Sequence, residues 1–99
     1  MHMIVAVLVL APQMFYVAQV PSFGCSSTAE VSNLQSVRSD AKAFQKLLTT
    51  QVVYGQCVTI PKGVLVEGSI ADTVSSTLLI NAKSDPPGYL VPLKDFKPK

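Results

Sequence analysis

The stretch QVVYGQCVTIPKGVLVEGSIADTVSSTLLINAKSDPPGYLVPLKDF, residues 51–96, alternates short runs of β-forming residues with strong turn signals. Val, Ile, Tyr and Thr suit a pleated, half-buried surface, whereas Pro, Gly and Asp mark turns. The pattern predicts strands at 52–60, 64–70, 77–83 and 89–91, followed by a tight turn at 93–96. Short strands at this spacing are typical of a small antiparallel barrel or sandwich.

The Pro-Lys-Gly turn at 61–63 organises the first two predicted strands. Pro presets φ for the second position of a turn and Gly accepts positive φ, so we expect a tight hairpin here. Gly68 in the return strand marks a bulge or bend of the kind that closes a small barrel. Because strand side chains alternate, Leu65 and Leu79 lie opposite the predicted core, where they either meet the helix or form an interface patch.

The closing segment GYLVPLKDF resembles the end of Src-homology-3-like barrels of the bacterial type. In that family a Gly, an aromatic residue, an apolar residue and Val-Pro precede a short helical turn and a final apolar residue. The matching positions are Gly88, Tyr89, Val91, Pro92 and Phe96. The resemblance covers about residues 51–96 and implies a small antiparallel β-barrel. The chain has no Trp and no clear aromatic pair, so the resemblance does not extend to a groove for proline-rich peptides.

Upstream of the strands, residues 28–49 are predicted to form one amphipathic helix. It opens with a capping box, in which the hydroxyl of Ser27 is followed three residues later by Glu30. Its apolar stripe, at spacings of three and four, consists of Leu34, Val37, Ala41, Phe44 and Leu48. We expect the stripe to pack on the barrel; the alternative is a seam for a partner or a dimer.

Residues 1–24 are predicted to be a signal peptide or a membrane anchor. Met3 to Ala11 is an unbroken apolar run, shorter than the roughly 20 residues that span a bilayer but typical of the apolar region of a secretory signal. The positive flank usual in such signals is missing. Two other interpretations are a buried strand, because Ile4 to Val9 is rich in β-formers, and a lipoprotein signal ending at Gly24-Cys25.

Cys25 and Cys57 are the only cysteines. In a small exported domain an even count predicts a disulfide, which would close a loop of about 33 residues and stabilise the fold by roughly 3–4 kcal/mol. In the cytosol both would instead be buried free thiols. A zinc site needs four ligands, and the single His of the chain, His2, lies in the predicted signal.

No catalytic constellation is recognisable, so we predict a protein that is not an enzyme and has no cofactor or metal. His is absent from residues 25–99, and no Gly-x-Ser-x-Gly motif or phosphate-binding loop occurs. Tyr54, Tyr89 and Phe96 are the candidate binding residues, because aromatic side chains are enriched at interfaces. The alternative for each is a place in the barrel core.

Composition limits the class of partner. The chain has 99 residues, which predicts a single small domain at 25–99, and its net charge is only +2 with no basic cluster. We therefore expect no nucleic-acid partner. The sequence predicts an exported binding or accessory module of the cell envelope, periplasmic or extracellular, with a protein or cell-wall ligand. The alternatives are a membrane-anchored small subunit of a larger complex, and a disulfide-stapled inhibitor that presents the loop Asp85 to Gly88.

Overall fold

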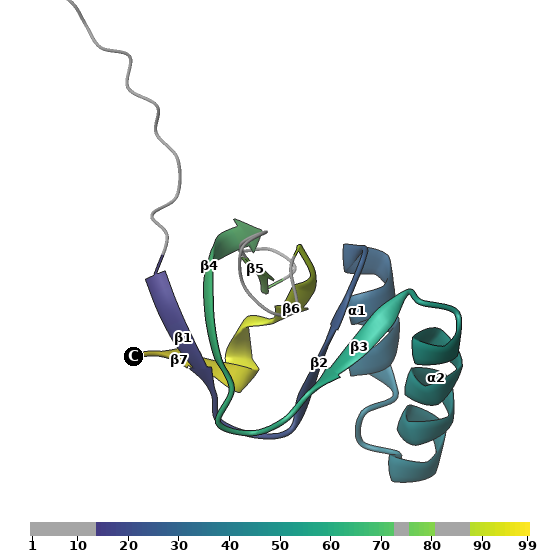
Figure 1. Cartoon of the computed structure of the whole chain (residues 1–99). Coiled ribbons are helices and arrows are strands. Elements are labelled where there is room, and N and C mark those ends of the chain that lie inside the picture. Colours follow the sequence, from purple (N-terminus) through teal and green to yellow (C-terminus); the bar gives the residue numbers. More distant parts are fainter. Residues whose placement is uncertain (1–13, 73–75, 81–87) are drawn as a thin grey trace, which may run out of the picture.

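The computed structural model describes residues 14–72, 76–80 and 88–99 (Figure 1). The fold belongs to the α+β class, as predicted. The helices are α1 (Thr28–Ser36) and α2 (Ala41–Val53), and a 3-10 turn, η1 (Leu93–Asp95), precedes the last strand. The strands are β1 (Met14–Ala18), β2 (Ser22–Cys25), β3 (Cys57–Ile60), β4 (Leu65–Asp72), β5 (Thr77–Ile80), β6 (Leu90–Pro92) and β7 (Phe96–Pro98).

The described strands form one antiparallel sheet in the order β3-β2-β6-β5-β4-β1-β7. Its main element is a long ribbon in which β1 and β2 run opposite β4 and β3. The register is the same on both sides of the bend in this ribbon, since Val17 pairs with Leu65 before it and Ser22 with Ile60 after it. The ribbon therefore turns as a unit, and it joins the helical part of the molecule to the curled sheet (Figure 1).

The predicted hairpin across residues 61–63 is wrong. Gly63 has the positive φ of 91° expected of a turn, but β3 pairs with β2, while β4 pairs with β1 and β5. The backbone N–H of Gly63 donates to the carbonyl of Ala18 at 2.8 Å. Long-range pairing with the N-terminal strands thus replaces the local hairpin. The first predicted strand is also shorter than expected, because residues 51–53 continue α2.

The described sheet curls without closing, because β3 and β7 stand at its two ends. The predicted closed barrel is therefore not confirmed. Gly68 lies where β4 comes close to β5, and a Cβ at this position would collide with the carbonyl of Leu79. The register irregularity predicted at Gly68 lies slightly further along, between Ile70 and Asp72. The 3-10 turn after β6 confirms the tight turn predicted at 93–96.

Two apolar clusters hold the fold together. The first lies inside the curl of the sheet and consists of Tyr16, Ala18, Ile60, Val66, Leu78, Ile80, Val91 and Phe96. The second lies between the helices and the strand pair β2–β3, which we call the β2–β3 arm. It consists of Phe23, Cys25, Val31, Leu34, Leu48 and Cys57. Leu78 and Ile80 are buried and Leu79 is exposed, which confirms the predicted faces of that strand.

The single helix predicted at 28–49 is wrong, because the chain forms two helices in that range. The capping box is present: Glu30 N–H donates to Ser27 Oγ, which itself donates to Glu30 Oε1. However, α1 ends at Ser36, and Asp40 caps a second helix by accepting a hydrogen bond from Ala43 N–H at 3.1 Å. The side chain of Asp competes for backbone donors, which favours a new N-terminus over a helix interior. Much of the predicted stripe still packs on the sheet, over β2 and β3.

The predicted boundary at residue 24 lies inside the sheet. β1 and β2, residues 14–25, pair with β3, β4, β6 and β7. The signal or anchor prediction for 1–24 thus overlaps two strands that the sequence analysis did not place at 14–25, and cleavage after residue 24 would remove β1 and most of β2. The apolar run at 3–11, with its alternative of a buried strand, lies outside the described residues.

Candidate functional site

The disulfide between Cys25 and Cys57 is present, as predicted. The two residues lie opposite each other in β2 and β3, with their Cα atoms 4.0 Å apart. The neighbouring pair is hydrogen-bonded, since Ser26 N–H donates to the carbonyl of Gln56. The cysteines therefore occupy a non-hydrogen-bonded position, where side chains of adjacent strands come closest. Both are buried, and their bond disagrees with the alternatives of free thiols and of a lipidated Cys25. The bond indicates a non-cytoplasmic location.

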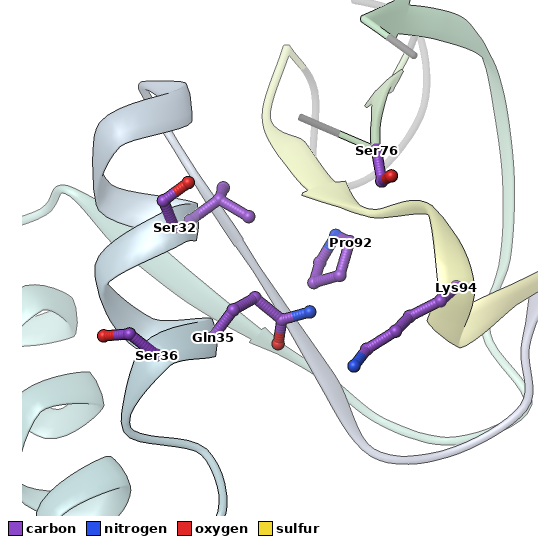
Figure 2. A pocket seen from close by; sticks show the side chains of 7 residues that line it. Ser32, Gln35, Ser36, Ser76, Pro92 and Lys94 are labelled. Carbon is purple, nitrogen blue, oxygen red and sulfur yellow. The ribbon is translucent and has the colours of Figure 1, made fainter. Parts of the chain in front are cut away.

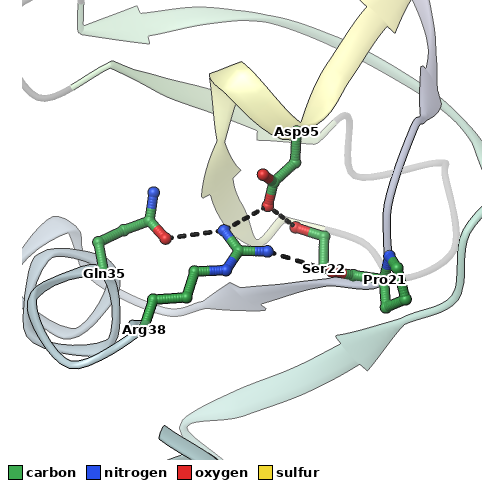
Figure 3. A network of polar contacts seen from close by, with 5 residues as sticks. All are labelled: Pro21, Ser22, Gln35, Arg38 and Asp95. Atoms are coloured by element: carbon green, nitrogen blue, oxygen red, sulfur yellow. Dashed lines mark hydrogen bonds and ion pairs between the residues drawn. The ribbon is translucent and has the colours of Figure 1, made fainter. Parts of the chain in front are cut away.

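Arg38 connects the two helices to Pro21, at the bend of the β1–β2 ribbon, and to Asp95 in η1 (Figure 3). It lies between α1 and α2, and its guanidinium forms an ion pair with Asp95 at 2.7 Å. It also donates to Gln35 Oε1 at 2.8 Å and to the carbonyl of Pro21 at 3.1 Å. Ser22 Oγ donates to the same carboxylate oxygen at 2.6 Å. The fork geometry of a guanidinium suits such a junction, because one side chain serves several acceptors.

The same guanidinium lies over two aromatic rings. Its central carbon is 5.3 Å from the ring centre of Phe23 and 5.7 Å from that of Phe44, within the range of cation–π attraction. The two rings are tilted, with centres 5.6 Å apart. Arg38 thus has few donors left for a ligand. We assign it a structural role: it fixes the helical pair against the curled sheet.

A pocket of about 320 Å³ opens beside this junction (Figure 2). One wall is α1; the other is formed by the start of β5 and the β6–η1 segment. Its lining residues are Val31, Ser32, Gln35, Ser36, Ser76, Pro92 and Lys94. We call it the α1 pocket. Its volume is at the lower end of the range typical of small-ligand sites, about 300–1,000 Å³.

The α1 pocket combines a buried apolar base with polar walls. Val31 and Pro92 are buried, while the walls carry hydroxyls, the amide of Gln35 and the ammonium of Lys94. Among the described residues that line the pocket, Lys94 is the one charged group, and none of them is a carboxylate. Gln35 has a fixed amide, because its Oε1 accepts from Arg38. Its Nε2 carries the remaining amide donors, and Figure 2 shows the ends of Gln35 and Lys94 in the same part of the pocket. The chemistry favours a ligand with hydrogen-bond acceptors and a negative charge.

Ser76 sits at the opposite wall in an unusual conformation. Its φ is +55°, the one positive φ among the described residues other than glycine. Its carbonyl accepts a hydrogen bond from Leu93 N–H at 2.8 Å, which ties this wall to η1. Such backbone conformations cost free energy, and they cluster at functional sites. The hydroxyl of Ser76 and the ammonium of Lys94 lie at opposite ends of the pocket, so the two groups do not form a nucleophile–base pair (Figure 2).

The structure does not gather the three predicted binding residues into one groove. Phe96 is buried in the first apolar cluster, which matches its alternative of a core position. Tyr54 is 72% exposed and caps the C-terminal end of α2. Tyr89 is half-buried just before β6. Most of the predicted inhibitor loop, residues 85–87, lies outside the described residues.

Sequence reasoning missed the α1 pocket, because its residues come from three distant segments. The only signal was the helix face: Ser32, Gln35 and Ser36 flank the apolar stripe. Nothing in the sequence showed that Ser76 and Lys94 would lie opposite them. Within the described part of the chain, no cluster of His, Cys, Asp and Glu side chains could hold a metal ion. Neither α1 nor α2 has the length and apolar character needed to cross a bilayer.

No family model, curated protein or solved structure matches this chain.

Proposed function

We propose that this protein is an exported, non-enzymatic binding module of the cell envelope whose ligand occupies the α1 pocket. The observation that carries this proposal is the convergence of hydroxyl, amide and ammonium groups in one pocket with a buried apolar base. The buried disulfide supports an oxidising compartment. The contacts Gln35–Arg38–Asp95 and Ser76–Leu93 tie the two walls to the rest of the fold, which suits binding because it lowers the cost of ordering the site around a ligand.

We also propose that the curled sheet is a variant of the Src-homology-3-like fold. The resemblance is supported by the sequence of β4, β5 and β6, followed by a 3-10 turn and a short last strand. In this proposal the helices are an insertion, carried on the β2–β3 arm. The disulfide lies near the base of that insertion. Together with the contacts of Arg38, it would hold α1 at a fixed distance from the other wall of the pocket.

The ligand proposed here is a peptide carboxylate, from either a protein segment or the peptide part of the cell wall. The ammonium of Lys94 and the amide donors of Gln35 would bind the carboxylate. The hydroxyls of Ser32 and Ser76 would bind backbone groups next to it. The buried base at Val31 and Pro92 would contact a small apolar side chain.

Chemical-shift mapping on the ¹⁵N-labelled full chain tests the proposal. The probes are soluble cell-wall muropeptides, a short peptide with a free C-terminal carboxylate, and its C-terminal amide. A chitin oligosaccharide supplies sugar chemistry without a carboxylate. We expect shifts at Ser32, Gln35, Ser76 and Lys94 with the carboxylate probes, and a much weaker effect with the amide.

Two variants and one matched control sharpen this test. Lys94→Gln removes the charge of the pocket and should weaken carboxylate binding about tenfold, the loss expected for one charge-assisted contact. Gln35→Leu removes the amide donors and should also weaken binding. Lys62→Gln removes an exposed charge outside the pocket lining and should change nothing. Equal binding by Lys94→Gln and the parent chain, or shifts centred on Tyr54, would contradict the proposal.

A membrane-anchored subunit is the second candidate, and one observation favours it. β1 begins at Met14, separated by two residues from the end of the apolar run at 3–11, and cleavage after residue 24 would remove β1 and most of β2. A retained run would attach the module to a membrane. Fractionation of cells that make the full chain distinguishes the two candidates: a salt-resistant membrane fraction supports the anchor, and a soluble form that begins before Met14 supports secretion.

A further inference from the structure

The outer surface of β1, β4 and β7 carries an apolar strip that nothing in the described part of the chain covers. Tyr16 and Ala18 point into the first apolar cluster, so Phe15 and Val17 point outward. Phe15 is 53% exposed, and Leu65, which pairs with Val17, is 46% exposed. The helices lie over β2 and β3, on the other side of the molecule (Figure 1).

Basic residues border this strip on the edge strand. Lys97 pairs with Val17, and it points outward because its neighbour Phe96 is buried opposite Ala18. The backbone N–H of Lys99 donates to the carbonyl of Phe15 at 2.9 Å, which places Lys99 beside Phe15. Both lysines are exposed. Glu67, opposite Phe15, is half-buried and is the acidic residue of these rows. We call Phe15, Val17, Leu65, Lys97 and Lys99 the β1 outer face.

We propose that the β1 outer face rests on an anionic lipid surface. Three observations point to this occupant. The face combines an aromatic and two aliphatic side chains with two flanking lysines, a combination that binds membrane interfaces. It includes the strand that begins at Met14, shortly after the apolar run Met3 to Ala11. That run is too short to span a bilayer, which takes about 20 residues, yet it is long enough to enter the interfacial region.

A second copy of the chain fits the face less well. A stable dimer usually buries about 800 Å² on each partner and involves some 20 residues a side. The β1 outer face has three apolar residues and two lysines, and paired copies would bring like charges together. A bilayer imposes no such minimum area, because single apolar side chains enter the interface while lysines face anionic headgroups. The inference goes beyond the proposed function: it assigns a surface on the sheet, distinct from the α1 pocket, and holds for either binding candidate.

The absence of Trp makes a direct test possible. Phe15→Trp and Leu65→Trp each place one reporter on the face in the full chain. Tyr54→Trp is the matched control, because that residue is exposed at the end of α2, away from the face. With vesicles that contain phosphatidylglycerol, we expect the first two reporters to shift to shorter wavelength and to be quenched by brominated acyl chains. The control reporter should keep the emission wavelength that it has without vesicles.

Flotation with the same vesicles supplies the affinity. Phe15→Ser/Leu65→Ser should lower binding about tenfold or more, from the loss of apolar area. Lys97→Gln/Lys99→Gln should weaken binding to anionic vesicles and leave binding to neutral vesicles unchanged. Val53→Ser/Tyr54→Ser, which removes an apolar pair that is more exposed than Phe15 and Leu65, should bind as the parent does. Circular dichroism checks that each variant is folded.

Three results would overturn the proposal. The first is that the parent chain does not rise with any of the vesicles. The second is that it binds while both face reporters stay in water, in which case the run at 3–11 acts alone. Finally, a blue shift that appears without vesicles and grows with protein concentration would identify a second copy as the occupant.

Discussion

Replacing Arg38 by Met should destabilise the fold by about 3 kcal/mol, because it leaves Asp95 buried without its cation. Removing one partner of a buried ion pair costs about 3–5 kcal/mol, whereas an exposed pair contributes less than about 1 kcal/mol. The side chain of Asp95 is 6% exposed and that of Arg38 is 22% exposed, so this pair lies nearer the buried limit. Loss of the contacts to Phe23 and Phe44 adds to the cost, while Ser22 still donates to the carboxylate and reduces it.

Urea denaturation followed by circular dichroism at 222 nm measures this change. For a domain of this size, a loss of about 3 kcal/mol corresponds to a fall in Tm of roughly 12–24 °C. Arg38→Lys keeps the charge but loses the forked guanidinium, so its loss of stability should lie between those of the parent and Arg38→Met. Lys62→Met, at an exposed position, is the control and should stay within about 0.5 kcal/mol of the parent.

A double-mutant cycle with Asp95→Asn then isolates the pair. We expect a coupling energy above about 1 kcal/mol, since the two groups are in contact and largely buried. The reasoning is refuted if Arg38→Met costs less than about 0.5 kcal/mol, or if the two single changes add without coupling. Either result would mean that the helical pair is held to the sheet by apolar packing alone.

Three further changes test other parts of the fold by the same denaturation assay. Cys25→Ala/Cys57→Ala should cost about 3–4 kcal/mol from the lost loop constraint, and a cost below about 1 kcal/mol would show that the bond is incidental. Gly68→Ala should cost more than about 2 kcal/mol, because the new Cβ collides with the backbone of β5. Gly55→Ala should cost about 1 kcal/mol, because Gly55 has a φ of +76° but open space around it. The reverse order of these two losses would contradict the close approach of the strands. Asp40→Ala should cost about 1 kcal/mol as a lost N-cap and Asp40→Asn very little, whereas equal losses would count against a helix start at this position.

Local features of the sequence were sufficient for several elements. The Ser27–Glu30 capping box, the strand that contains Leu78 and Ile80, and the turn at 93–95 depend on residues close in the chain, and the structure has all three. The disulfide followed from the cysteine count and the small size of the domain. The three local predictions held because a single strong local rule decided each of them, and the disulfide held because the chain has only two cysteines to pair.

The errors arose where one local sequence pattern is compatible with two different structures. Residues 14–24 are apolar, and a buried strand and the end of a signal segment look alike at that length. The turn at 61–63 has hairpin chemistry, but pairing with the N-terminal strands decided the topology. Asp40 lies within the single helix predicted at 28–49, whereas its side chain caps the start of a new helix. The α1 pocket depends on long-range contacts, which no short stretch of sequence contains.

The intact mass of the protein from its native host, alkylated before and after reduction, tests the central claim of an exported, disulfide-braced module most directly. We predict that neither Cys25 nor Cys57 reacts before reduction under denaturing conditions, that both react after it, and that the chain retains Met14 and therefore β1. Two thiols that react without reduction would contradict the non-cytoplasmic location. A mature chain that begins after residue 18 would contradict the sheet itself.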